Sequence, residues 1–452
     1  MPTANPGDSN ESRHILRLLW PMWGTQLLQM GHGLVDTLMA GHYGTHAMAA
    51  VAIGSGLWLP VLLFMQGVLL ASLPLFSQAR GQQYWPALSQ ILQQSLLIAW
   101  GLALLIAGLL YLLPLSFHLL GIKADMIADV RLYLRGILPG VPAVASFMVL
   151  RAYSEAQGQV LPITLISATT LAVNIPLNHI MMQGWHQIPA MGGAGCGFAT
   201  ASVYWLGLLL LLLWISIAPS YQHCRWYAAD WRPDWRRLQQ IIRLGLPLGA
   251  ALFFEVSAFA LIAVILAPLG ASTVAGHQIT LSIASFLFML PLALSNALTI
   301  RTSHYLGSNN HSGLPHFLRI AFKLSLTIAA ANAVLVILLR PWAPQWYTAD
   351  PQVIALAQRL LLYTAAFQLF DGLQVCTTGV LRGLHDTKGP FWITLLAYWG
   401  LTLPLGYILG LTRLSGSQHG AEGLWFALVF GLITAALLLG LRLSSKIRQL
   451  PL

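Results

Sequence analysis

Charged side chains are scarce in this chain. Only 8% of its 452 residues are Asp, Glu, Lys or Arg, whereas an average soluble domain carries about 25%. Hydrophobic residues make up 57% of the chain, and its mean hydropathy is +0.70. A composition this apolar argues against a soluble domain. It predicts a protein that crosses a membrane many times.

Cysteine is also rare, with three residues in the whole chain. Cys196 and Cys376 fall inside apolar runs, Cys224 falls in a polar stretch, and no CxxC pair occurs. This spacing argues against both a disulfide framework and a zinc site.

Motifs of enzymes and nucleotide-binding proteins are missing as well. The chain has no H-E-x-x-H, no G-x-S-x-G and no phosphate-cradling G-x-x-x-x-G-K-[ST]. A polytopic membrane enzyme is therefore the least favoured alternative, and ATP is not expected as the energy source. We expect no catalytic residues and no cofactor.

Apolar runs recur along the chain, and twelve of them are long enough for transmembrane helices of about 20 residues. A membrane barrel would show shorter strands of alternating polarity, which are not present. We therefore predict an all-α polytopic membrane protein. The expected helices span residues 14–40, 47–76, 88–114, 126–152, 161–183, 192–218, 240–268, 273–304, 314–340, 352–382, 389–411 and 421–443.

Basic residues are distributed unevenly between the two ends of these helices. If both termini lie on one side of the membrane, that side holds all but six of the 23 Lys and Arg residues. The six are Lys123, Arg131, Arg135, Arg340, Arg359 and Arg413. Because Lys and Arg in short loops are retained in the cytoplasm, we expect both termini to be cytoplasmic. The net charge of +10 then indicates contact with membrane lipids and no nucleic-acid partner.

The two halves of the chain repeat each other in parallel, with an offset of roughly 226–231 residues. The matched pairs include Pro21 and Pro247, Gly44 and Gly270, Arg151 and Arg382, and Pro176 and Pro404. Each half holds an even number of helices, so both halves enter the membrane with the same polarity. Parallel repeats of this kind occur in secondary transporters.

The repeat suggests a division of the chain into five segments. We expect, in order, a polar N-terminal tail, a six-helix lobe, a cytoplasmic linker, a second six-helix lobe and a C-terminal tail. Their bounds are residues 1–13, 14–218, 219–239, 240–443 and 444–452.

Three carboxylates, Asp36, Glu255 and Asp371, lie inside the apolar runs. An acidic side chain in the middle of a bilayer costs about 2.5–3.5 kcal/mol even on the most lenient scale, so it usually has a function. Glu255 and Asp371 both belong to the second lobe. Two carboxylates facing one dry cavity need a shared proton or a bound cation, and their oxygens suit a hard cation such as Na+. The alternative is a protonated acid that is hydrogen-bonded to a neighbouring helix.

Neutral polar residues occur at similar depth in the first lobe. Asn174 and Asn178 are one helical turn apart, Thr200 lies in the next expected helix, and His32 lies one turn before Asp36. Such groups stabilise a buried carboxylate or complete the shell of an ion. They would equally form a hydrogen-bond network that only fixes helix packing, and His32 is better explained in that way.

Several motifs resemble the multidrug and toxic compound extrusion (MATE) family, specifically its bacterial NorM-like branch. They are Leu34-Val35-Asp36-Thr37, Asn174-Ile175-Pro176-Leu177-Asn178, the glycine cluster Gly192–Gly197, Phe254-Glu255-Val256-Ser257-Ala258-Phe259 and Leu381-Arg382-Gly383. The resemblance covers nearly the whole chain. It implies two six-helix bundles around a central cleft, which export organic cations in exchange for inward Na+ or H+.

The resemblance also implies roles for individual residues. Glu255 and Asp371 match the coupling-cation site of the second lobe, where some relatives have a tyrosine at the position of Phe367. Asp36, Asn174, Asn178 and Thr200 match the polar cavity of the first lobe. The matched substrate-binding positions are Asp36, Ser55, Phe259, Gln278 and Asp350.

Further expectations follow for partners and location. We expect small organic cations and membrane lipids as partners, a functional monomer, and insertion in the bacterial cytoplasmic membrane. The main alternative is a lipid-linked oligosaccharide flippase of the same superfamily. That function would need a cationic cavity for pyrophosphate, whereas the deep charges here are acidic.

Overall fold

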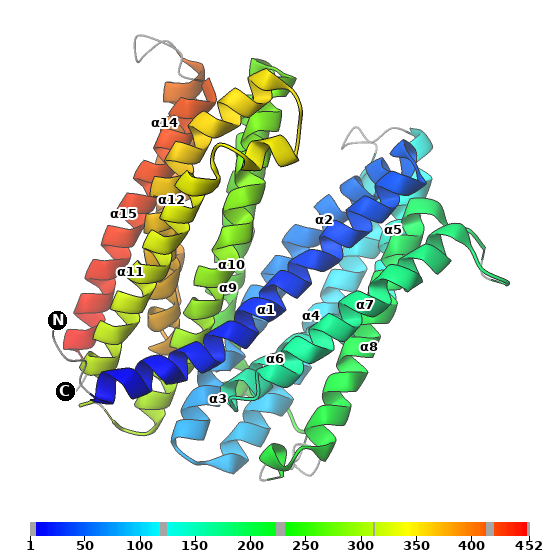
Figure 1. Cartoon of the computed structure of the whole chain (residues 1–452). Coiled ribbons are helices and arrows are strands. Elements are labelled where there is room, and N and C mark those ends of the chain that lie inside the picture. Colours follow the sequence, from blue (N-terminus) through cyan, green and yellow to red (C-terminus); the bar gives the residue numbers. More distant parts are fainter. Residues whose placement is uncertain are drawn as a thin grey trace. The chain divides into compact units, whose positions relative to one another are not determined.

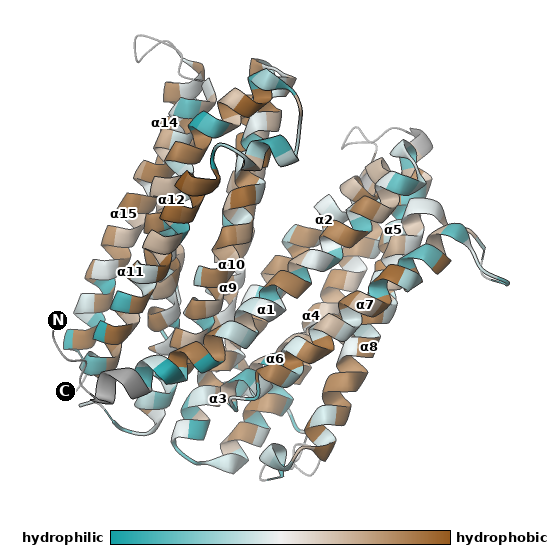
Figure 2. Cartoon of the chain, in the orientation of Figure 1, coloured by the Kyte–Doolittle hydropathy of each residue, from teal (hydrophilic) through white to brown (hydrophobic). Residues whose placement is uncertain are grey.

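The computed structural model describes residues 6–117, 124–187, 189–222, 231–310, 312–412 and 420–449. These residues are almost entirely helical (Figure 1), because a backbone in lipid must satisfy its hydrogen bonds internally. Apolar residues cover most of the length of the helices (Figure 2). The all-α membrane fold predicted from the sequence is therefore confirmed.

Two compact units divide the chain. The N-terminal unit is Gly24–Gly249, and the C-terminal unit combines Met1–Trp23 with Ala250–Leu452. The helices α1 and α9 each cross from one unit to the other. The expected lobes began at residues 14 and 240, so the units start about ten residues further along these two helices.

The N-terminal unit is built from eight α-helices and short 3-10 turns among its described residues. The α-helices are α1 (Pro6–Tyr43, from Gly24 onward), α2 (Thr45–Leu70), α3 (Ser72–Gly81), α4 (Trp85–Leu112), α5 (Ala124–Ile137), α6 (Val141–Ala156), α7 (Leu161–Gln183) and α8 (Gly195–Ile217). The 3-10 turns are η1 (Leu113–Ser116), η2 (Leu138–Gly140), η3 (Gly192–Ala194) and η4 (Pro219–Tyr221). α8 packs against α5, α6 and α7, and α4 packs against α6.

The C-terminal unit is arranged around one central helix. Its elements are α9 (Trp235–Leu266), η5 (Ala267–Leu269), α10 (Ala271–Gly307), α11 (Leu314–Leu339), η6 (Ala343–Trp346), α12 (Pro351–Gly383), α13 (Lys388–Leu395), the π-helical turn η7 (Leu396–Thr402), α14 (Leu403–Leu411) and α15 (Gly420–Arg448). α12 packs against α10, α11 and α15. Side chains that point away from lipid on α12 are consequently deeply buried.

Eleven segments of the described residues are long and apolar enough to cross a membrane. Pairs of shorter helices join to form single spans, as in Thr45–Gly81, Met126–Ala156 and Lys388–Leu411. α1 is not among the eleven, because polar residues such as Gln26, Gln29 and Asp36 lower its hydropathy. With its 38 residues, α1 is the twelfth long helix.

Several helices extend beyond the apolar runs that predicted them. α1 begins at Pro6, inside the expected tail 1–13, and α15 continues to Arg448. α9 begins at Trp235, inside the expected linker 219–239, because Asp234 Oδ1 accepts hydrogen bonds from the backbone N–H groups of Arg236 and Arg237. Residues 223–230 of that linker, including Cys224, lie outside the described residues. Hydropathy marks only the part of a helix in hydrocarbon, so it misses these polar turns.

The repeat is visible in local backbone geometry. Pro21 lies inside α1 and Pro247 inside α9. Gly44 follows α1 with φ of 158°, and Gly270 follows α9 and η5 with φ of 101°. At Gly270 the left-handed conformation favours glycine because a Cβ atom would be strained. Equivalent positions of the two halves thus end equivalent helices.

Candidate functional site

Asp36 lies at the centre of a polar cluster in the N-terminal unit. Asn178 Nδ2 on α7 donates to Asp36 Oδ1 at 2.7 Å, and Thr200 Oγ1 on α8 donates to Oδ2 at 3.2 Å. Asn178 Nδ2 also donates to Asn174 Oδ1 at 3.2 Å. Asp36 is 7% exposed, and both asparagines are fully buried. The structure therefore brings together the four residues expected in the polar cavity of the first lobe, and their role stays a prediction.

One atom of this cluster, Asn178 Oδ1, is buried without a hydrogen-bond partner, and the side chain of Asn174 lies within hydrogen-bonding reach of the Asp36 carboxylate. An unsatisfied buried polar group costs about 1–3 kcal/mol. A cluster with one carboxylate and one open amide oxygen can bind a further polar ligand. Small cations, protons and water all fit that description.

Close packing of α8 against its neighbours positions the polar cluster around Asp36. The glycine cluster Gly192–Gly197 forms η3 and the start of α8. A Cβ atom at Gly197 would collide with the backbone of Tyr133, and one at Gly195 would collide with the backbone of Met181. The glycines therefore let α8 approach α5 and α7 closely enough for Thr200 to reach Asp36.

Sequence reasoning missed two tyrosines beside Asp36. Tyr133 on α5 and Tyr204 on α8 both interact electrostatically with the Asp36 carboxylate. Tyr133 did not stand out in the sequence, because the neighbouring Arg131 and Arg135 indicate the polar end of a helix. The Nε2 atom of His32, by contrast, lies 3.4 Å from Thr170 Oγ1. That contact agrees with a packing role for His32.

Glu255 on α9 and Asp371 on α12 form the acidic pair of the C-terminal unit. They interact electrostatically, and Asp371 is 2% exposed. Glu255 is partly buried and lines a small pocket. The other lining residues are Ala251, Phe254, Thr394, Leu395, Tyr398 and Trp399. In the part of the chain that the structure describes, neither acid forms an ion pair with a basic side chain.

Aromatic rings surround this acidic pair. The ring of Phe259 lies 6.3 Å from that of Phe367 and 6.0 Å from that of Tyr398, and Phe367 lies 6.0 Å from Trp425. Tyr398 interacts electrostatically with both acids, and its hydroxyl group lies within hydrogen-bonding reach of the side chain of Gln374. The sequence offered a signal for Gln374, which lies three residues after Asp371 on one helix face. It offered none for Tyr398.

The remaining residues expected at the substrate site lie in different units and have ordinary local contacts. Ser55 on α2 donates to the carbonyl oxygen of Ala52 at 3.3 Å. Gln278 on α10 is exposed. Asp350 is the N-cap of α12, where its carboxylate accepts from the backbone N–H of Gln352 at 2.9 Å. A carboxylate at this position stabilises the start of a helix.

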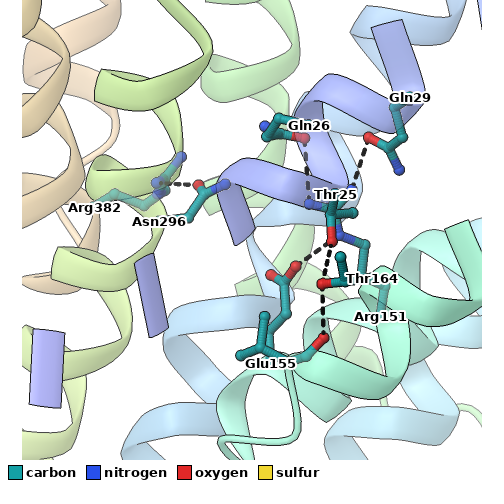
Figure 3. Close-up of polar contacts among 9 residues, drawn as sticks. Thr25, Gln26, Gln29, Arg151, Glu155, Thr164, Asn296 and Arg382 are labelled. Atoms are coloured by element: carbon teal, nitrogen blue, oxygen red, sulfur yellow. Dashed lines mark hydrogen bonds and ion pairs between the residues drawn. The ribbon is translucent and has the colours of Figure 1, made fainter. Parts of the chain in front are cut away.

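Buried arginines mark a further polar cluster in each unit (Figure 3). In the N-terminal unit Arg151 pairs with Glu155 at 2.6 Å and donates to Gln29 Oε1 at 2.9 Å. Glu155 is 2% exposed, so its carboxylate is both buried and paired. In the C-terminal unit Arg382 donates to Asn296 Oδ1 at 2.9 Å. Arg151 and Arg382 are partners in the sequence repeat, and both hold polar side chains of neighbouring helices.

No group of three or more His, Cys, Asp and Glu side chains suited to a metal ion occurs among the described residues. Multivalent metal centres usually require such a group.

Comparison with known proteins identifies the family. The MatE family model matches residues 21–180 and 247–408, so it matches each half of the chain once. The two matches begin at Pro21 and Pro247, which are partners in the predicted repeat. The internal repeat is therefore confirmed.

Relatives match over nearly the whole chain. The "Probable multidrug resistance protein NorM" of Acinetobacter baylyi is 40% identical, with 97% of each chain covered. The multidrug resistance protein PmpM of Pseudomonas aeruginosa is 38% identical, with 97% of this chain and 92% of PmpM covered.

Solved structures share the fold. The eukaryotic MATE transporter AtDTX14 superposes with a TM-score of 0.87 at 19% identity. The Vibrio cholerae MATE transporter VcmN in its bent form superposes with a TM-score of 0.84 at 20% identity. Each superposition covers 98% of this chain and 98% of the other chain. At this identity the structures support the fold alone, and the family rests on the sequence matches. The chain belongs to the MatE family and is a multidrug efflux transporter, not an enzyme.

Proposed function

We propose that this transporter is an antiporter, which exports lipophilic organic cations and admits Na+ or H+ in exchange. The coupling ion binds at Glu255 and Asp371, and Asp36 with Asn174, Asn178 and Thr200 forms a second site for an ion or a proton. Both termini face the cytoplasm, and the protein works as a monomer in the bacterial cytoplasmic membrane.

One observation carries the proposal: Asp36, Glu255 and Asp371 lie inside apolar helices and form no ion pair with a basic side chain among the described residues. Asp36 is held by amide and hydroxyl donors, and Asp371 lies beside a second acid. A fixed salt bridge would keep these charges neutral at all times. Without one, each acid must take its countercharge from something mobile, such as a proton, an inorganic cation or a cationic drug.

The substrate would bind where acidic and aromatic side chains meet. Lipophilic cations gain both dispersion and charge stabilisation against such walls. We propose Asp36, Ser55, Phe259, Gln278 and Asp350 as substrate contacts. Phe259 lies beside the aromatic rings around Asp371, so drug and ion would compete for neighbouring positions in the C-terminal unit.

The energy available to such an antiporter is sufficient for resistance. One positive charge that moves inward through 100 mV releases about 2.3 kcal/mol, and a tenfold ion gradient adds about 1.4 kcal/mol. Together they support a drug gradient of several hundredfold for each charge, before the charge of the exported drug is subtracted. Coupling requires that ion and drug favour different states of the transporter, since a ligand with equal affinity for both shifts nothing.

The test measures ethidium transport in vesicles under an imposed Na+ gradient and, separately, an imposed pH gradient. Asp36→Asn, Glu255→Gln and Asp371→Asn are expected to lose at least tenfold in gradient-driven transport. Glu422→Gln and Asp129→Asn are matched controls, because Glu422 pairs with Arg359 and Asp129 with His46 at exposed positions. Wild-type transport in all three site variants under both gradients would contradict the proposal.

A further inference from the structure

A groove with basic side chains lies on the surface of the C-terminal unit, where α11 begins and α15 ends. Both helices pack against α12, and their ends leave a groove of about 420 Å³ between them. Its lining residues are Pro315, Leu318, Arg319, Phe322 and Lys323 of α11 and Ile447 of α15. None of these residues belongs to the proposed ion or substrate sites, so the groove requires a separate explanation.

The α11 wall of the groove carries two stripes of different chemistry. Arg319 and Lys323 are one helical turn apart, and so are Leu318 and Phe322, so each pair shares a face of the helix. Arg319 and Lys323 are exposed, and Phe322 is 58% exposed. Leu326, one turn beyond Phe322, is 41% exposed and extends the apolar stripe. A ligand in this groove therefore meets positive charge and an apolar surface side by side.

The two basic side chains of the groove form no ion pair in the part of the chain that the structure describes. The acidic side chains described near this end of the unit are bound to other arginines. Glu11 pairs with Arg301 at 2.6 Å, and Asp386 pairs with Arg442 at 2.8 Å. The positive charge of the groove is consequently left for an anion from outside the chain.

The depth of the groove matches the headgroup region of a membrane. α11 coincides with the candidate membrane span Leu314–Leu339. Arg319 and Lys323 therefore lie about 8 and 14 Å along the helix from the first residue of this span. Long basic side chains reach from such positions toward the polar interface, while their stems cover apolar surface. Basic pockets between transmembrane helices at this level are suited to lipid headgroups.

We propose that the groove is a binding site for an anionic phospholipid. The lipid phosphate binds between the Arg319 guanidinium and the Lys323 ammonium group, and one acyl chain lies along Leu318, Phe322 and Leu326. The site goes beyond the proposed antiport and does not depend on it. A zwitterionic lipid would fit the apolar stripe, but its cationic headgroup amine opposes the two basic side chains, so charge selects the occupant. A free phosphate would meet the charges and leave the apolar stripe uncovered.

The test of the charged half uses delipidated full-length protein in a nonionic detergent, and native mass spectrometry counts the bound lipid. Phosphatidylglycerol is expected to bind wild type at least tenfold more tightly than phosphatidylcholine. The double variant Arg319→Gln with Lys323→Gln should lose this preference, because it removes both charges. Arg236→Gln with Arg243→Gln is the matched control, since it removes two exposed charges on α9 outside the groove.

The apolar half has its own variant. Phe322→Ala is expected to weaken the binding of phosphatidylglycerol and of phosphatidylcholine about fivefold each, because it removes apolar surface that an acyl chain would cover. Phe426→Ala is the matched control on α15, where Phe426 is 52% exposed and does not line the groove. Unchanged binding of both lipids to Phe322→Ala would overturn the placement of the acyl chain.

Thermal unfolding in the same detergent gives a second readout that does not depend on transport. Phosphatidylglycerol should raise the melting temperature of wild type by joining α11 to α15, and the rise should disappear in Arg319→Gln with Lys323→Gln. Without lipid this variant should melt like wild type, since both changes are at exposed positions. Equal losses of lipid in the two double variants would overturn the site and indicate a general attraction to the surface. An equal rise with inorganic phosphate would overturn a lipid as the occupant.

Discussion

Single side chains on two other helices hold the carboxylate of Asp36 by hydrogen bonds. The carboxylate receives one bond from an amide of α7 and one from a hydroxyl of α8. Hydrogen bonds to a charged group contribute about 1.5–3 kcal/mol each. Changes of single atoms in these donors should therefore alter the affinity of Asp36 for its ligand while the helices stay in place.

Thr200 offers the clearest single-atom test at this site. Thr200→Val keeps the shape of the side chain and removes the donor to Asp36, so ethidium efflux is expected to fall about tenfold. Thr200→Ser keeps the hydroxyl and should stay close to wild type. Ser202→Ala is a control, because Ser202 donates only to the carbonyl oxygen of Phe198 in its own helix. Full activity of Thr200→Val, at wild-type expression, would show that this bond has no role in transport.

The buried pair of Arg151 and Glu155 makes a prediction about stability. Glu155→Leu leaves the Arg151 charge without its carboxylate, and such a loss typically costs about 3–5 kcal/mol. The melting temperature in detergent should fall markedly. The double variant Arg151→Met with Glu155→Leu should recover part of the loss, because no uncompensated charge remains. Equal melting temperatures of Glu155→Leu and wild type would contradict a structural role for this pair.

At the scale of elements, glycine contacts and irregular turns set how close the helices lie. The glycines at the start of α8 allow backbone contact with α5 and α7. In the C-terminal unit the π-helical turn η7 presents Tyr398 to the acidic pair. Neither feature changes the hydropathy of its span, and both decide which side chains meet.

Gly197→Ala tests the contact between α8 and α5. A Cβ atom at this position would collide with the backbone of Tyr133, and overpacking of this kind costs about 1–3 kcal/mol. Thermal unfolding in detergent should reveal the loss, together with weaker transport, because Thr200 moves with α8. Gly101→Ala on α4 is the matched control, since a Cβ atom there meets no other group within 4 Å. Comparable losses in the two variants would argue against a specific contact at Gly197.

The whole molecule is a transporter of the MatE family with two repeats, each matched by the same family model. It carries no phosphate-cradling motif in its sequence. Its proposed source of energy is an ion gradient across the membrane.

Reconstituted protein should therefore transport ethidium in liposomes that contain no nucleotide. An imposed Na+ or pH gradient is expected to drive accumulation, and gramicidin, which dissipates gradients of both ions, should stop it within the dead time of the assay. Liposomes with the Asp371→Asn variant serve as the control for leakage. Accumulation that requires added ATP, or that survives gramicidin, would contradict gradient coupling.

The sequence alone determined the class of this protein, the number of its long helices, its repeat and the presence of three acids inside apolar runs. Those properties follow from hydropathy and from the cost of charge in lipid, which act on each segment separately. Only the tertiary structure decided which neutral groups surround each acid. No sequence pattern links Tyr133 or Tyr398 to the acids, and the burial of Glu155 depends on Arg151 and the helices around it. Contacts between residues more than a hundred positions apart depend on how helices pack, and hydropathy carries no record of that packing.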